Sequence, residues 1–410
     1  GWLSVQVRDA LRKKKRTFPK TTSYFAMRSR EESAQKDDGG AVAVPSAAPT
    51  ERDPNPGTAD RDGPAVDQAK GHKTVLRSER SAQIDFRDKL LLAPLTTVGN
   101  LPFRRIAKRF GADVTYSEMT LALNLLKGQP SEWSMVRRHA SEDIFGVQIA
   151  GSKPDQLART VELLQDEADI DFIDLNCGCP IDGLCKTGCG AALMRLRPAR
   201  FERIVRAMSA VATVPLSIKL RTGYLTSTPT AHEWIPKLKL WGADLITIHG
   251  RSKEARYTRL ADWEYIDRCT KLAEPVPLVG NGDILSFEDA EAHRRETGVS
   301  ALMIGRGALI KPWIFTEIKE RRHWDISASE RFDVLKEFAM NGLEHWGSDT
   351  EGVEKTRRFL LEWMSFLHRY IPVGLLERLP QRINERPPRY FGRNDLETLM
   401  ASPAASDWVK

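Results

Sequence analysis

Several features are scarce in this chain of 410 residues. No apolar run approaches the roughly 18 residues of a membrane-spanning helix, which excludes such a helix and predicts that no membrane is bound. The chain opens with Gly1 rather than Met and lacks the apolar stretch of a secretory signal peptide, so we expect a fragment of a longer protein.

Cysteine is also scarce, with five residues, an odd number, in a long chain. This count argues against a secreted disulfide scaffold and indicates a reducing compartment. We therefore expect the protein in the cytoplasm, the nucleus or both. A G-x-G-x-x-G dinucleotide motif is missing as well, so a nicotinamide cofactor would have to share the site of another ligand.

Apolar periodicity is missing from the N-terminal part. Residues 31 to about 80 consist mainly of Pro, Gly, Ala and charged residues, a composition that cannot offset its ordering entropy and predicts a disordered linker. The preceding "LRKKKRTFPK" is either a solvated tail or an arm that attracts nucleic acid. The net charge of +7 is compatible with a polyanionic partner. We assign residues 1–83 to one basic, low-complexity, disordered segment.

A regular alternation begins at residue 84. Short runs rich in β-forming residues follow one another at 89–95, 112–119, 143–151, 171–178, 214–223, 243–251, 276–284 and 300–308. Helix-like segments such as "KPDQLARTVELLQDEA" lie between them. Eight strands alternating with helices over roughly 230 residues predict an α/β fold, the (β/α)8 TIM barrel. The competing fold, a doubly wound open sheet, would want a glycine-rich turn where this chain has "APLTTVGNLP".

Polar or glycine residues end nearly every one of these runs. The polar ones include Thr96, Thr97, Glu118, Gln148, Asn176, Lys219, Arg221, His249 and Arg251. In such barrels the C-terminal strand ends form one mouth, where the chemistry takes place. A single polar strand end could simply cap a turn, but their convergence on one mouth predicts a functional site.

The last two strands carry a second signal. The segments "GNGDI" (280–284) and "GRGAL" (305–309) follow strands seven and eight, and Arg306 adds a positive charge. Their glycines would let backbone amides approach a ligand, and barrels often bind a phosphate at this place. The alternative is that the glycines only form the turns that close the barrel.

A cation and an imidazole lie on the neighbouring strands. Lys219 interrupts an apolar strand, and an inward-facing lysine is costly unless it is paired or functional. Together with His249 it would lie beneath a ring that extends from the phosphate, an arrangement that suits a reduced flavin. His249 by itself is ambiguous, because core histidines bonded to the backbone are common.

Four of the five cysteines fall in "NCGCPIDGLCKTGCGAALM", with the spacing C-x-C-x5-C-x3-C. Structural zinc and iron–sulfur sites favour other spacings, so we expect no metal, and a disulfide does not suit a reducing compartment. One working thiol remains, and Cys179, followed by the rigid Pro180, is best placed over the mouth. The other cysteines are interpreted as packing residues. They are Cys177, Cys185, Cys189 and Cys269.

The same stretch resembles the D-x-N-x-G-C-P signature of the tRNA-dihydrouridine synthase family. The segments "SIKLRTG", "TIHGRSKEARYTRLADWEYI" and "GNGDILSFEDA", with the C-terminal run, resemble its eukaryotic dihydrouridine synthase 3 branch. The resemblance covers roughly residues 84–408. It departs from the pattern at Cys177, where many members have valine. Members of this branch usually carry zinc-finger modules ahead of the barrel, so such modules are expected upstream.

The resemblance implies a role for individual residues. It makes Cys179 the general acid, and Asn176 and Arg251 substrate contacts. It implies that FMN is held by Pro94, Leu95, Thr96, Gln148, Lys219, His249, Asn281, Gly282, Asp283, Gly305 and Arg306.

The reaction implied is reduction of the C5–C6 double bond of a uridine in tRNA to dihydrouridine, at position 47 of the variable loop. NADPH would be the reductant, and messenger RNA is a further candidate substrate. Two other interpretations stay open. The chain could be an FMN-dependent barrel acting on a small molecule, as dihydroorotate dehydrogenases do, or a non-catalytic RNA-binding module.

The C-terminal part is helical in pattern and rich in arginine. We assign residues 84–320 to the FMN-binding catalytic barrel and residues 321–410 to a helical tRNA-binding domain. Arg357, Arg358 and Arg382 are candidate phosphate contacts. The alternative is a solvated helical face that packs on the barrel.

Overall fold

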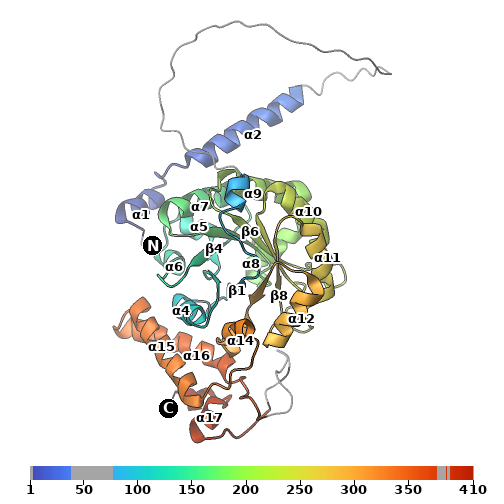
Figure 1. The fold of residues 1–410 in the computed structure, drawn as a ribbon. Coiled ribbons are helices and arrows are strands. Elements are labelled where there is room, and N and C mark those ends of the chain that lie inside the picture. The colour runs from blue at the N-terminus through green and yellow to red at the C-terminus, as the bar shows by residue number, and fades with distance from the viewer. Residues whose placement is uncertain (1–2, 38–76, 376–384, 386–387, 410) are drawn as a thin grey trace.

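The structure, a computed structural model, describes residues 3–37, 77–375, 385 and 388–409. Its centre is a closed barrel of parallel strands surrounded by helices (Figure 1). The barrel strands are β1 (Leu90–Leu92), β2 (Val114–Tyr116), β4 (Ile144–Ala150), β5 (Phe172–Cys177), β6 (Leu216–Arg221), β7 (Leu245–His249), β8 (Leu278–Asn281) and β9 (Ala301–Ile304). Pairing of β1 with β9 and of β2 with β4 closes the ring, which confirms the predicted TIM barrel. A two-residue strand that was not predicted, β3 (Thr120–Leu121), adds to the end of β4.

Helices cover the outside of the barrel, so almost all strand residues are buried. The strands are therefore rich in apolar residues, as in other parallel sheets covered by helices. Leu91, Val114, Phe172 and Met303 belong to the cluster that fills the barrel interior. A second, larger cluster joins the outer strand faces to the helices. Met303 also lines the cavity at the C-terminal strand ends, so the apolar filling forms part of the floor of the site.

Amphipathic helices form the outer layer. Asn100 caps α4 by accepting a hydrogen bond from the Phe103 amide at 3.2 Å, and Ser286 caps α12 in a capping box with Asp289. The helices and the 3-10 helix η1 around the barrel are α4 (Leu101–Arg109), α5 (Ala122–Leu126), α6 (Pro130–Met135), α7 (Pro154–Glu167), α8 (Asp182–Lys186), η1 (Gly190–Arg195), α9 (Pro198–Val211), α10 (Ala231–Trp241), α11 (Trp263–Ala273), α12 (Phe287–Thr297), α13 (Arg306–Ile310) and α14 (Ile314–Glu320).

The C-terminal helices lie against one side of the barrel (Figure 1). They are α15 (Ala328–Trp346), α16 (Thr350–Leu367), α17 (Asp395–Met400) and α18 (Ala405–Trp408). Trp363 of α16 is fully buried, donates through Nε1 to the Leu309 carbonyl at 3.0 Å and meets Phe103 edge to face. This contact fixes α16 beside α4 and α13, at the rim of the barrel mouth.

The predicted linker over residues 1–83 requires correction at its ends. Residues there form α1 (Val5–Arg12), α2 (Pro19–Asp37) and α3 (Arg77–Ser81). Leu11 is buried, and the Thr21 amide and hydroxyl donate to the buried Glu162 of α7 at 3.0 and 2.8 Å. The composition of this segment does not predict these helices, because a few contacts with the barrel stabilise them. Residues 38–76, the centre of the predicted linker, lie outside the described residues.

In the part of the chain that the structure describes, none of the helices combines the length and the apolar character needed to cross a membrane.

Candidate active site

A cavity of about 670 Å³ opens at the C-terminal ends of the barrel strands. Its walls come from the strand ends, the loops that follow them and helix α16. Its lining includes the predicted thiol, one predicted substrate contact and every predicted cofactor contact: Pro94, Leu95, Thr96, Gln148, Asn176, Cys179, Lys219, His249, Asn281, Gly282, Asp283, Gly305 and Arg306. The fold therefore brings together residues that are spread over more than half of the sequence. Their individual roles stay predictions.

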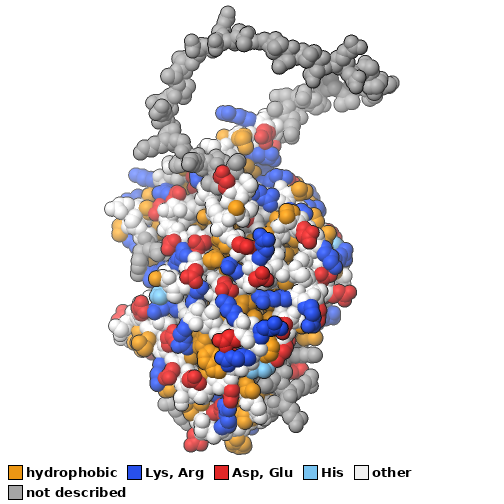
Figure 2. Space-filling model, viewed as in Figure 1, with side chains coloured by type: hydrophobic (Ala, Val, Ile, Leu, Met, Phe, Trp, Pro, Cys, Tyr) orange, Lys and Arg blue, Asp and Glu red, His pale blue; other side chains and the backbone are white. Residues whose placement is uncertain are grey.

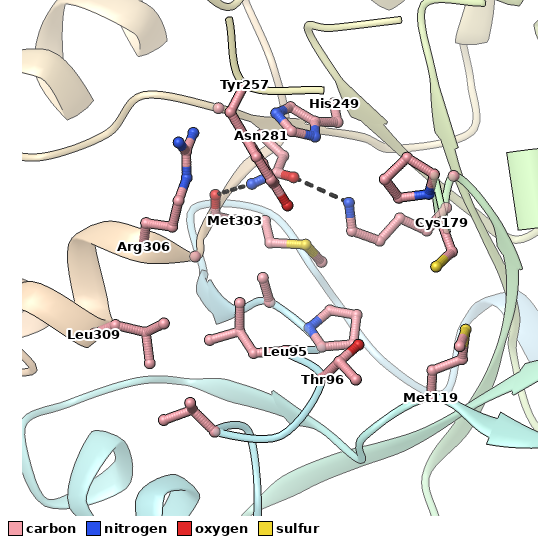
Figure 3. A pocket seen from close by; sticks show the side chains of 18 of the residues that line it. Leu95, Thr96, Met119, Cys179, His249, Tyr257, Asn281, Met303, Arg306 and Leu309 are labelled. Carbon is pink, nitrogen blue, oxygen red and sulfur yellow. Dashed lines mark hydrogen bonds between the residues drawn. The ribbon is translucent and has the colours of Figure 1, made fainter. Parts of the chain in front are cut away.

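One side of the cavity offers a free positive donor. Arg306 and Cys179 lie on opposite sides of the cavity (Figure 3). Arg306 donates through one Nη atom to Asp283 at 3.2 Å, whereas its Nη1 is buried and has no hydrogen-bond partner among the described residues. Burial lowers the pKa of Arg306 to about 10, which still leaves it charged at neutral pH. An unpaired buried donor is costly, so an anionic ligand such as a phosphate fits this corner.

Arg251, the other predicted substrate contact, is not part of the lining. It is buried and donates to both carboxylate oxygens of Asp283 at 2.7 and 2.6 Å, and to the Arg259 carbonyl at 2.5 Å. Asp283 has a left-handed backbone conformation, with φ of 52°. One guanidinium nitrogen of Arg251, Nη2, thus contacts both oxygens of Asp283 and fixes this carboxylate. The fixed carboxylate in turn accepts the hydrogen bond from Arg306. Arg251 therefore supports the anion corner, and its contact with substrate stays a prediction.

A second cation lies deeper in the site. Lys219 Nζ donates to Asn281 Oδ1 at 2.9 Å, and Asn281 Nδ2 donates to the Met303 carbonyl at 2.8 Å (Figure 3). Burial lowers the pKa of Lys219 to about 8, although the nearby Asp174 carboxylate acts in the opposite direction. Lys219 is therefore charged at neutral pH and loses its proton in mildly alkaline solution.

His249, beside this lysine, is a neutral acceptor. Burial and the surrounding cations keep its pKa well below the usual range. Arg251 Nη1 lies 3.3 Å from His249 Nε2, and a guanidinium can only donate. The ring therefore accepts at Nε2 and carries its proton on Nδ1. The site thus combines a charged lysine with a neutral imidazole.

The thiol of Cys179 points into the cavity from the loop after β5 (Figure 3). Asn176 Oδ1 accepts hydrogen bonds from the amides of Gly178 and Cys179 at 3.2 and 2.9 Å, and Arg221 Nε donates to the Gly178 carbonyl at 2.7 Å. Burial raises the pKa of the Cys179 thiol, so the thiol keeps its proton at neutral pH. A protonated, positioned thiol can act as a general acid.

Cys179 is the cysteine of this loop that lines the cavity. Cys177 and Cys189 are buried, and the half-buried Cys185 donates its S–H to the Cys179 carbonyl at 3.5 Å. Cys269 is buried on α11. All five are free thiols, and no group of three or more His, Cys, Asp or Glu side chains is placed to hold a metal ion among the described residues.

Sequence reasoning missed the part of the site that depends on tertiary neighbours. Tyr257, in the loop after β7, lines the cavity with a side chain that is 46% exposed, and its ring lies 4.4 Å from Arg306 Cζ and 5.8 Å from Arg221 Cζ. Helix α16 adds Glu362 and Phe366 to the rim. The only available signal was the arginine-rich loop that follows a strand end, in "HGRSKEARYTR".

The predicted phosphate contacts of the C-terminal part differ from one another. Arg357 and Arg358 are exposed neighbours on α16, about one turn before the rim residue Glu362. Arg357 is paired with Glu354 at 2.7 Å. Arg358 has no ion pair among the described residues, and its guanidinium lies 5.8 Å from the Phe359 ring centroid. Arg382 lies outside the described residues.

Comparison with known proteins places this architecture in a family. The family model described as "Dihydrouridine synthase (Dus)" matches residues 91–366. A relative from Xenopus tropicalis named "tRNA-dihydrouridine(47) synthase [NAD(P)(+)]-like" is 54% identical over 408 residues, which cover 100% of this chain and 63% of the relative. Proteins with the same name from Homo sapiens and Arabidopsis thaliana are 62% and 55% identical, over 82% and 81% of this chain and 51% and 48% of their own length.

This chain therefore spans less than two thirds of the length of these relatives. The family match covers the barrel strands, the loop with Cys179, the anion corner and helix α16 up to the rim of the mouth. It confirms the resemblance carried by the cysteine motif and the strand ends. The chain belongs to the dihydrouridine synthase family.

Proposed function

We propose that this chain reduces the C5–C6 double bond of a uridine in tRNA to dihydrouridine, at position 47, with FMN as cofactor and NADPH as reductant. One observation carries the proposal: a single cavity joins an anion corner at Arg306, a cation at Lys219 and a protonated thiol at Cys179. The names of the relatives, which describe tRNA-dihydrouridine(47) synthases [NAD(P)(+)]-like, support the same substrate and position.

The residues of the cavity fit FMN. The unpaired Nη1 of Arg306 suits a phosphate, and Lys219 with the neutral His249 suits the edge of a flavin ring that becomes anionic on reduction. Gly282 has φ of 130°, and a Cβ there would meet the Ala261 side chain at 2.6 Å, so the wall requires glycine at this turn. When bound, reduced FMN supplies the hydride that C6 of the uracil receives.

Cys179 supplies the proton. The thiol proton passes to C5, and the thiolate left behind regains a proton from solvent. Burial raises the pKa of this thiol, which keeps the acid form available at neutral pH. Because no separate dinucleotide motif is present, NADPH would enter the same cavity before the RNA does.

Helix α16 is the first surface proposed to contact RNA, because Glu362 and Phe366 form part of the rim of the cavity. Its exposed Arg358 is free to bind a phosphate, whereas Glu354 already neutralises Arg357. Acidic and basic side chains are interspersed over the C-terminal helices (Figure 2). We therefore expect only a modest electrostatic contribution from this region.

A second surface is proposed at the turn after α1, residues Lys13–Lys15, which we name the basic turn. All three lysines are exposed, and none has an ion pair among the described residues. Arg16 bonds to Asp166 of α7 at 2.8 Å and Thr21 bonds to Glu162, so both flanks of the turn are anchored to the barrel. Fixed cations can bind a polyanion at a lower entropic cost than a free tail.

The remaining features of the proposal concern its context. Upstream zinc-finger modules would contribute to RNA binding, messenger RNA is a further candidate substrate, and the protein would act in the cytoplasm, the nucleus or both.

The proposal is tested with the purified chain, reconstituted with FMN. We expect the flavin absorption bands to stay with the protein through gel filtration. With NADPH, the protein should form dihydrouridine in unmodified tRNA but not from free uridine or uracil. Absence of bound flavin, or turnover of the free base with none on tRNA, would contradict the proposal.

A further inference from the structure

A row of buried amide groups connects the barrel interior to the loop that carries Cys179. Asp174 of β5 is fully buried, and its Oδ2 accepts a hydrogen bond from Gln148 Nε2 at 2.7 Å. Gln148 Oε1 accepts from Asn176 Nδ2 at 2.8 Å. Asn176 Oδ1 then accepts from the Cys179 amide at 2.9 Å. Four residues on two neighbouring strands and one loop thus form a continuous chain of hydrogen bonds.

The direction of this chain follows from the chemistry of its first member. A carboxylate can only accept, so Gln148 must turn its NH₂ group towards Asp174. Its carbonyl oxygen must then face Asn176, which leaves the oxygen of Asn176 for the loop amides. The second oxygen of Asp174 accepts from the Ser217 hydroxyl at 2.6 Å, so this group does not compete for Gln148.

We propose that Asp174 is a positioning residue, whose carboxylate orients Gln148 and Asn176 and thereby holds the backbone turn that presents Cys179. This inference rests on the proposed function only in so far as Cys179 is the general acid. Asp174 lies outside the cavity lining and would act through the two amides. Burial raises the pKa of Asp174 to about 6, so the group is still a carboxylate at pH 8.

Replacing the Asp174 carboxylate by the amide of asparagine keeps the shape of the side chain. It therefore tests the donor-to-acceptor direction of the hydrogen-bond chain and leaves the packing nearly unchanged. In Asp174→Asn, the side chain at position 174 can donate as well as accept, so Gln148 and Asn176 gain a second, reversed arrangement. In that arrangement an NH₂ group of Asn176 faces the Cys179 amide, and two donors oppose each other. We expect uridine reduction to fall by about 10²-fold, the loss that a misplacement of about 1 Å can cause.

A second substitution, at Gln148, should restore the donor-to-acceptor direction of the hydrogen-bond chain. Gln148→Glu in the Asp174→Asn background returns a carboxylate to the chain, one position closer to the loop. That carboxylate accepts from both neighbours, so the oxygen of Asn176 is again left for the Cys179 amide. We expect the double variant to regain at least a tenth of the wild-type rate. Gln148→Glu alone places two carboxylates in contact and should not reach that rate.

Ser217→Ala is the matched control, because it removes the other hydrogen bond of the same carboxylate without changing any direction. It should lower the melting temperature but leave uridine reduction within about twofold of wild type. Flavin reduction by NADPH does not use the thiol, but Asp174→Asn also removes the carboxylate that raises the pKa of Lys219. We therefore expect a several-fold loss in flavin reduction, at least tenfold smaller than the loss in uridine reduction. Equal losses in both half-reactions, or no recovery in the double variant, would overturn the inference.

Alkylation of Cys179 by iodoacetamide, located by mass spectrometry, gives a measure that does not need RNA. A loosened turn should expose the thiol, so its alkylation should become several-fold faster in Asp174→Asn and return towards wild type in the double variant. This result would support the positioning role even if the wild-type protein failed to reduce uridine, in which case the proposed function alone would fail. An unchanged alkylation rate in Asp174→Asn would contradict the positioning role.

Discussion

The arginines of the barrel mouth and those of helix α16 are held in opposite ways. In the mouth, Arg251 and Arg306 are largely buried and share Asp283, and one donor of Arg306 is left without a partner among the described residues. On α16, Arg357 and Arg358 are exposed to solvent, and Arg357 is paired with Glu354 within its own helix.

This difference indicates what each region can contribute. A buried hydrogen-bond donor without a partner has lost its hydrogen bonds to water. A ligand that accepts a hydrogen bond from this donor is therefore bound strongly and in a fixed direction. An exposed arginine already has water and salt ions as partners, and a local ion pair is worth little. We therefore expect the mouth to determine cofactor binding and chemistry, and the outer helices to adjust RNA affinity.

The largest effect is expected at the thiol in the mouth. Cys179→Ala should lower uridine reduction by about 10²–10⁴-fold, the usual contribution of a general acid, while bound flavin and its reduction by NADPH are retained. Stopped-flow absorbance of the flavin separates the two half-reactions. Cys269→Ala, at a thiol on α11 that does not line the cavity and does not touch the Cys179 loop, is the control and should react at nearly the wild-type rate. A Cys179→Ala protein with unimpaired uridine reduction would remove the thiol from the mechanism.

The next largest effect is expected in the anion corner. Arg306→Ala should raise the dissociation constant of FMN by about 10–100-fold, as expected for the loss of a charge-assisted hydrogen bond. Equilibrium dialysis measures this change. Arg295→Ala, at an exposed arginine paired with Glu296, is the control and should have no effect. Tight retention of FMN by Arg306→Ala would place the phosphate elsewhere.

A smaller effect is expected at the basic turn. Replacing Lys13, Lys14 and Lys15 together by Gln should weaken tRNA binding about tenfold at moderate salt and reduce the log–log salt slope by up to about 3. Filter binding at several salt concentrations measures the slope. FMN binding should not change. If the slope stays as in the wild type, this turn is only a solvated part of the surface.

Lys14 offers a structural control for that experiment. Its φ of 55° is left-handed, a conformation that glycine adopts at no steric cost. Lys14→Gly should therefore keep or raise the melting temperature while it removes one positive charge. Weaker RNA binding with undiminished stability would separate the electrostatic role from a structural one.

The rate of flavin reduction in the mouth should depend on pH through the protonation of Lys219. Its pKa, lowered by burial to about 8 from an ordinary value near 10.5, means that the cation is present below pH 8 and lost above it. We expect flavin reduction by NADPH to become several-fold slower between pH 7 and pH 9.5. Lys219→Met should be slow and independent of pH over this range. A wild-type rate that is constant to pH 9.5 would assign the stabilisation of reduced flavin to another group.

The smallest effect, and the sharpest comparison within one helix, is expected for the two neighbours on α16. Arg358→Ala should weaken tRNA binding by about threefold and reduce the salt slope by about 1, whereas Arg357→Ala should change affinity by less than twofold, because Glu354 already neutralises Arg357. Equal losses in the two variants would mean that the Glu354 pair opens when RNA binds.

The sequence predicted the barrel and most of the cavity because those features are local. A polar residue at or just after the end of an apolar strand can be recognised in the sequence alone. The positions of Lys219, His249 and Arg306 at the mouth could therefore be predicted from the sequence. The thiol was found in the same way, from a loop that follows a strand. Such patterns need no knowledge of distant contacts.

Other features depend on partners that are remote in sequence. The hydrogen bonds of Arg251 could not be predicted, because their acceptor Asp283 lies 32 residues away in the sequence. Helix α2 was missed because its own composition is polar, and its anchor is Glu162, more than 140 residues away. Tyr257 was missed because an aromatic residue in a loop becomes part of a site only through its neighbours.

We propose that one cavity brings a reduced flavin and the Cys179 proton to a uridine of tRNA. The most direct measurement is a single turnover in which the FMN-loaded protein, reduced by NADPH and freed of excess NADPH, is mixed anaerobically with unmodified tRNA. We predict that flavin reoxidation is accompanied by an equal amount of dihydrouridine, mapped to position 47 by mass spectrometry, and that it is slow with Cys179→Ala. A flavin that stays reduced in the presence of tRNA, or that reoxidises without forming dihydrouridine, would contradict the account.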